Sequence, residues 1–165
     1  MTSTLSLLGV LHTTISLVPV AAGLYGFVRH GAIEPSTDSG KVYLAGLVLS
    51  VLTSFGLSST GGFNPGHALG ILALLAVAAS LLVPRLRFLG ALRPYLATLG
   101  HSFSYFLLLV PGVAETLTRL PAGQPLAQGP QSPVVRATLL AWTLLFLLGA
   151  ALQVWRIGTR RTACP

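Results

Sequence analysis

Charged residues are scarce in this 165-residue chain and make up only 8% of it. An ordinary soluble domain carries about 25% charged residues. So few charges cannot cover a globular surface with solvated groups. Because 53% of the residues are hydrophobic, we expect hydrocarbon rather than water to surround this molecule.

Cysteine is almost as scarce, since Cys164 is the only one. This excludes an intrachain disulfide and a thiolate metal site. The sequence also has no phosphate-binding loop, zinc motif or dinucleotide fingerprint, and no serine adjoins a histidine and an acid in a hydrolase pattern. We therefore favour a protein without catalytic activity of its own, and we assign no catalytic or metal-binding residues.

The few charges leave long apolar runs between them. About 20 apolar residues, rising about 1.5 Å each, cross a hydrocarbon core of about 30 Å. The longest run is interrupted by "SSTGGFNPGH", a cluster of turn-forming residues. The sequence thus predicts an all-α, polytopic transmembrane bundle in a single integral membrane domain (1–165), with five spans at about residues 5–28, 42–57, 67–83, 95–117 and 134–155.

The net charge of +7 is typical of some nucleic-acid-binding proteins, but the distribution of the basic residues argues against that partner. They occur singly or in pairs at the ends of apolar runs, where they anchor helices and set orientation. Five spans place eight of them on one side of the bilayer and only Arg119 and Arg136 on the other. The positive-inside rule then predicts an outward N-terminus and a cytoplasmic C-terminus.

Polar residues of the fourth predicted span fall on one helical face, at steps of three, four and seven residues. Three of them, Tyr105, Glu115 and Arg119, form a candidate polar site within the membrane or at its surface. Glu115 and Arg119 are four residues apart in the favourable order for an ion pair. They are either an interfacial anchor of the helix end or a small outward-facing site for a proton, a cation or a headgroup.

Histidines provide the sharpest functional hypothesis, because His12 and His101 lie inside predicted spans and His67 lies at the entrance of another. A b-type haem needs two neutral imidazoles at nearly the same depth. At about 1.5 Å per residue, His12 and His101 differ in depth by roughly 15 Å and His12 and His67 by roughly 7 Å. Only the second pair is compatible with one haem. Otherwise, these histidines form hydrogen bonds across helices or to carbonyls that Pro19 and Pro111 free.

Three stretches resemble small bacterial multi-pass membrane proteins of a domain-of-unknown-function type: "LHTTISLVPVAAGLYGFVRHG", "FNPGHALGILAL" and "GHSFSYFLLLVPGVAETLTRLPAGQPL". The resemblance covers about four of the five predicted spans. It implies a location in the bacterial cytoplasmic (inner) membrane. Such families supply no catalytic residues that could be carried over to this chain.

Two functional hypotheses follow from the sequence. The first is an integral membrane protein that acts as an accessory or interaction subunit, or that binds a small lipophilic ligand, with the lipid bilayer and other membrane subunits as partners. The second is a small b-type haem or quinone-reactive redox subunit. A transporter is disfavoured, because the sequence has no inverted repeat and no cluster of embedded charges.

Overall fold

The computed structural model describes residues 7–57, 62–121 and 123–162, which are helical with short connections and contain no strand. Five of its helices are long and apolar enough to cross a membrane, which confirms the predicted fold class and number of spans. These helices are α1 (Leu7–His30), α2 (Asp38–Ser54), α3 (Pro65–Leu82), α4 (Arg93–Arg119) and α5 (Pro133–Thr162).

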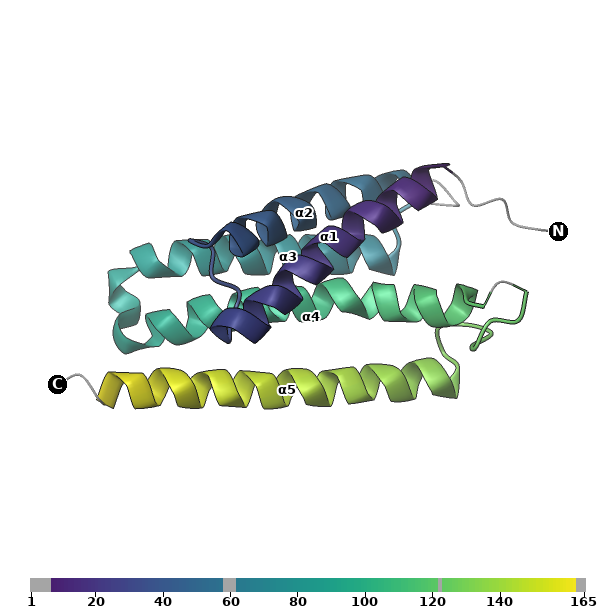
Figure 1. Cartoon of the computed structure of the whole chain (residues 1–165). Helices are drawn as coiled ribbons and strands as arrows, with labels where there is room; N and C mark the ends of the chain where they lie inside the picture. The colour runs from purple at the N-terminus through teal and green to yellow at the C-terminus, as the bar shows by residue number, and fades with distance from the viewer. Residues whose placement is uncertain (1–6, 58–61, 122, 163–165) are drawn as a thin grey trace.

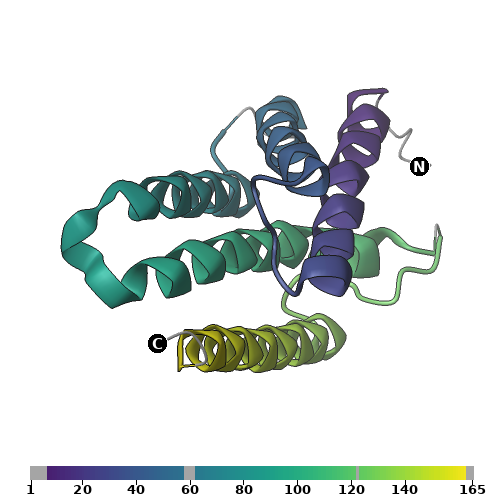
Figure 2. The ribbon, with the colours of Figure 1, turned by 60° about the vertical axis from the view of Figure 1, so that its left-hand side comes forward.

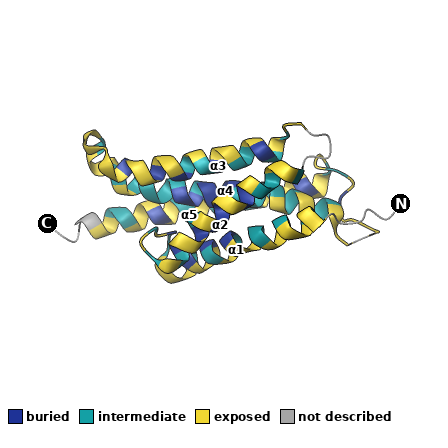
Figure 3. Ribbon diagram, turned by 90° about the horizontal axis from the view of Figure 1, so that it is seen from above, coloured by how far each residue is buried: buried dark blue, intermediate teal, exposed yellow. Residues whose placement is uncertain are grey.

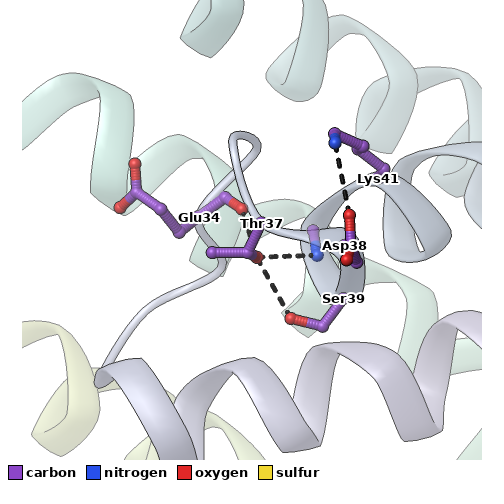
Figure 4. A network of polar contacts seen from close by, with 6 residues as sticks. Glu34, Thr37, Asp38, Ser39 and Lys41 are labelled. Atoms are coloured by element: carbon purple, nitrogen blue, oxygen red, sulfur yellow. Dashed lines mark hydrogen bonds and ion pairs between the residues drawn. The ribbon is translucent and has the colours of Figure 1, made fainter.

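Local side-chain chemistry fixes where α2 and α3 begin. The Thr37 hydroxyl accepts a hydrogen bond from the Gly40 amide at 3.1 Å and thereby caps α2. Figure 4 shows this cap beside the Glu34 carbonyl, which accepts from the Thr37 hydroxyl at 2.8 Å. At α3 the Asn64 side chain accepts from the His67 amide at 3.0 Å. Both starts therefore lie a few residues before the predicted spans.

The C-terminal helix is longer than predicted. The predicted fifth span ended at about Trp155, but α5 continues to Thr162 and has 30 residues. Such a helix is about 45 Å long, and the hydrocarbon core is about 30 Å thick. The last turns of α5 therefore extend beyond the hydrocarbon. Leu5, the expected start of the first span, and Cys164 lie outside the described residues.

Successive helices alternate in direction, so the charged connections collect at two ends of the bundle (Figure 1). One end holds the end of α1, the start of α2, the α3–α4 connection and the end of α5. We call it the basic end, because its described cations are Arg29, Lys41, Arg85, Arg87, Arg93, Arg156 and Arg160. Among the described residues, the other end, called the opposite end, has only the cations Arg119 and Arg136. The structure thus groups the basic residues as the span count predicted.

Helix α4 lies at the centre of the bundle. It packs extensively against α3 and α5, while α1 packs extensively against α2 and touches α4 as well. Figure 2 shows α5 on the side of α4 away from α2 and α3. Burial follows this arrangement, since α2 and α4 carry more buried positions than α1, α3 or α5, and α5 is largely exposed (Figure 3).

Two glycines allow α1 to approach its neighbours closely. A Cβ atom added at Gly46 of α2 would lie 2.8 Å from Pro19 Cδ of α1. One added at Gly23 of α1 would lie 2.5 Å from the Tyr105 ring of α4. In lipid, such contacts between small residues replace the hydrophobic effect as a source of helix association.

We predict that Gly46→Ala lowers the stability of the bundle, because the added methyl group must displace Pro19. The expected cost of such overpacking is about 1–3 kcal/mol. Gly149→Ala in α5 is the matched control, since a Cβ atom there meets nothing within 4 Å and alanine favours helix. Thermal unfolding of both variants in detergent at one scan rate measures the difference. A Gly46→Ala midpoint equal to that of Gly149→Ala would contradict the close α1–α2 contact.

Candidate functional site

Buried polar side chains gather around α4 in the interior of the bundle. We call this group the polar core; its members are Tyr43, His101, Ser102, Ser104, Tyr105 and Gln153. They come from α2, α4 and α5, all of which are candidate membrane spans. Because an unpaired polar group in hydrocarbon costs several kcal/mol, the partners of each decide what the polar core does.

Tyr43 and Ser104 join α2 to α4. The Ser104 hydroxyl donates its hydrogen to the His101 carbonyl at 2.7 Å. It therefore accepts from the Tyr43 hydroxyl, 2.7 Å away. Both side chains are fully buried, so this chain of two hydrogen bonds is a dry link between the two helices.

Tyr105, one of the residues singled out from the sequence, joins α4 to α1. Its hydroxyl donates to the Val20 carbonyl at 3.1 Å. Its ring packs edge-on against Phe27, with centroids 5.1 Å apart, and fits the space beside Gly23. The hydroxyl and the ring are thus both engaged in helix packing.

Gln153 is a polar link that was not among the site residues predicted from the sequence. Its amide nitrogen donates to the Gly31 carbonyl at 2.9 Å, and its amide oxygen accepts from the Ser102 hydroxyl at 2.8 Å. One side chain therefore joins α5, α4 and the α1–α2 connection. In the sequence, Gln153 is recognisable only as a single amide within an apolar run. Its partners could not be predicted, because they lie 51 and 122 residues away in the chain.

His101 differs from the other members of the polar core. Its Nδ1 lies 2.7 Å from the Ala97 carbonyl, which can only accept, so Nδ1 carries a hydrogen and Nε2 of the neutral ring is an acceptor. Nε2 is buried and has no hydrogen-bond partner among the residues that the structure describes. The lone pair of Nε2 is therefore a hydrogen-bond acceptor that no described residue uses, and it lies inside the bundle, in the half nearer the basic end.

His12 and His67 lie toward the opposite end and are engaged with neighbouring helices. His12 Nδ1 lies 2.9 Å from the Thr53 hydroxyl, and His12 Nε2 lies 3.4 Å from Ser16 Oγ. His67 Nε2 donates to the Ser54 carbonyl at 3.0 Å, and its ring stacks on Phe55. Axial ligation of a haem by these two histidines would require both to release such bonds. Within the described ranges, no cluster of three metal-ligating side chains occurs.

Glu115 and Arg119 form the ion pair that their spacing predicts. Their side chains are 59% and 68% exposed, and they lie in the last turns of α4. An exposed pair of this kind contributes about 0–1 kcal/mol. Along the helix, Glu115 lies about 15 Å and Arg119 about 21 Å from buried Tyr105, so the structure does not bring the three residues of the candidate polar site together. The pair is placed where an interfacial anchor would be.

A groove of about 490 Å³ lies between α2 and α3. We call it the α2–α3 groove. Two of its lining residues, Leu47 and Val77, also belong to the hydrophobic core. Toward the opposite end the helices approach closely, since a Cβ atom at Gly70 would meet Val51 at 3.2 Å. The lining is wholly aliphatic: Leu44, Ala45, Leu47, Val48, Leu49, Leu74, Val77 and Leu81.

Comparison with known proteins gave no match to a family model, a curated protein or a solved structure. The polar core and the α2–α3 groove are therefore the features from which a function can be inferred.

We predict that Gln153→Met destabilises the bundle by about 1–2 kcal/mol, because its hydrogen bonds to α4 and to the α1–α2 connection are lost while side-chain volume is kept. The matched control is Gln128→Met, at an exposed position of the α4–α5 connection, which should change the unfolding midpoint little. Thermal unfolding in detergent measures both. A Gln153→Met protein as stable as the control would show that Gln153 does not hold these segments together.

Proposed function

We propose that this protein is a non-enzymatic integral membrane protein that binds the hydrocarbon tail of a lipid-like molecule in the α2–α3 groove. The observation that carries the proposal is the groove itself, with its wholly aliphatic lining between two candidate membrane spans. A polar ligand would find no hydrogen-bond partner on these walls. An acyl or isoprenoid chain needs none.

The size of the groove agrees with this occupant. Small-molecule sites have volumes of about 300–1,000 Å³ and mainly apolar linings, and the groove has about 490 Å³. Tyr43 and Gly46 hold α2 to α4 and α1, and α3 packs extensively against α4. The site is thus largely formed before a ligand arrives, which lowers the entropic cost of binding.

The cellular location belongs to the same proposal. The excess of basic residues at one end supports a bacterial cytoplasmic membrane with the basic end inside, according to the positive-inside rule. In that orientation the groove opens to the hydrocarbon of the cytoplasmic leaflet. Membrane lipid then has direct access to it.

We predict that Val48→Phe lowers the amount of lipid that remains bound to the purified protein. Val48 lines the groove and is 43% exposed, so a phenyl ring there fills the groove without entering the core. The control is Leu144→Phe, which adds a ring to the exposed side of α5, where Leu144 is 54% exposed. Native mass spectrometry of the detergent-solubilised chain counts the bound lipids. Equal retention by both variants would refute the proposed site.

A b-type haem or quinone-reactive redox subunit is the second candidate, and the unpartnered Nε2 of His101 favours it. If lipid binding is the function, the purified protein shows no Soret band after haem supplementation. Absorption spectra with and without dithionite measure this. A band that shifts on reduction and disappears in His101→Ala would replace the first candidate with the second.

A further inference from the structure

The basic end of the α2–α3 groove carries positive charge on both of its walls. Lys41 precedes the groove residues Leu44 and Ala45 on α2, and Arg85 follows Leu81 after α3. On α2, steps of three and four residues place Lys41 on the same helical face as Leu44 and Ala45. Arg85 is the last residue of the short 3-10 helix that directly follows α3. The two cations therefore lie about one turn beyond the same end of the groove, one near the start of α2 and one just after α3, the helices that form its walls.

The charge at this end is not balanced by acids. Lys41 lies 3.3 Å from Asp38, but among the described residues the ion pairs are this one and Glu115–Arg119. Arg85 thus keeps its full charge. Arg87 follows it in the α3–α4 connection, where Arg93 bonds the Gly90 and Pro84 carbonyls. The groove therefore ends at a region of net positive charge.

The α3–α4 connection is also apolar enough to lie at the membrane surface. Phe88 is 82% exposed and Leu92 is 58% exposed, and both lie beside the arginines in the sequence. Exposed apolar side chains interleaved with basic ones are typical of segments that rest among lipid headgroups. Arginine side chains extend their charged ends to that layer while their stems stay in hydrocarbon.

From these observations we infer that the ligand of the α2–α3 groove is an anionic phospholipid of the leaflet at the basic end, with its tail in the groove and its phosphate-bearing headgroup at Arg85 and Lys41. This inference rests on the proposed function and adds the class of headgroup. The wholly aliphatic walls select for a tail, and Arg85, which has no acidic partner among the described residues, selects for net negative charge. A zwitterionic lipid with the same tails satisfies only the first requirement.

The experiment compares dioleoyl phosphatidylglycerol with dioleoyl phosphatidylcholine, which have the same tails. The full-length chain in detergent is given equal amounts of both, and native mass spectrometry counts the bound molecules of each. We expect phosphatidylglycerol to predominate. In Arg85→Gln the preference should fall roughly fivefold, the ratio that about 1 kcal/mol per cation gives, while total lipid retention changes less. The preference should also fall as salt is raised.

Arg160→Gln is the matched control, because it removes the same charge from the same end, on α5, which packs against α4 and away from the groove. It should keep the preference. Arg85→Lys retains the charge and should also keep it, which covers the case in which Arg85→Gln folds poorly. Equal losses in Arg85→Gln and Arg160→Gln, or loss in Arg85→Lys, would overturn the inference by showing either a diffuse or a structural effect.

The same data separate the two proposals. If the two lipids bind equally and both are lost in Val48→Phe, the headgroup inference fails and the groove proposal stands. If Val48→Phe retains both lipids as Leu144→Phe does, the groove proposal itself fails.

Discussion

The hydrogen bonds that α4 makes to its neighbours are the interactions on which the rest of this bundle depends. Apolar side chains gain little free energy by moving from lipid hydrocarbon into a helix interface, because both surroundings are apolar. Helix association therefore relies on close packing and on polar links. Helix α4 has such links to α1 through Tyr105, to α2 through Ser104 and to α5 through Ser102. Helix α4 also accepts a hydrogen bond, because the Trp142 indole of α5 donates to the Phe106 carbonyl of α4. This carbonyl adjoins that of Leu107, which Pro111 leaves without its helical donor.

This arrangement explains why polar residues in an apolar span need not indicate chemistry. Among the residues considered from the sequence, Tyr105, His12 and His67 all have hydrogen-bond partners on other helices or segments. A side chain that is engaged in such a bond is not free to bind a ligand. His101 stands apart, because the carbonyl four residues before it fixes the position of its hydrogen and leaves Nε2 without a partner among the described residues.

The α2–α3 groove arises from an uneven distribution of contacts. The interfaces of α1 with α2 and of α4 with both α3 and α5 are extensive, whereas α2 and α3 meet over a small area. They touch at Gly70 and Val51 near the opposite end and leave the aliphatic groove in the other half. The Tyr43–Ser104 link holds α2 to α4, and close packing at Gly100 and Ser80 holds α3 to α4, so these contacts also maintain the space between α2 and α3. The contacts that stabilise the bundle are thus also the ones that keep the proposed binding groove open.

The sequence by itself determined the all-helical membrane fold, its five spans, the pairing of Glu115 with Arg119 and the collection of cations at one end, because these depend on run lengths and local spacing. Only the tertiary structure decided the partners of Gln153 and Ser104, the unpartnered nitrogen of His101 and the α2–α3 groove. The lining residues of the groove are leucine, valine and alanine, which look the same in a sequence whether they face lipid, a core or a ligand. Their role depends on how far apart two helices lie, and that distance is set by contacts between residues remote in the chain.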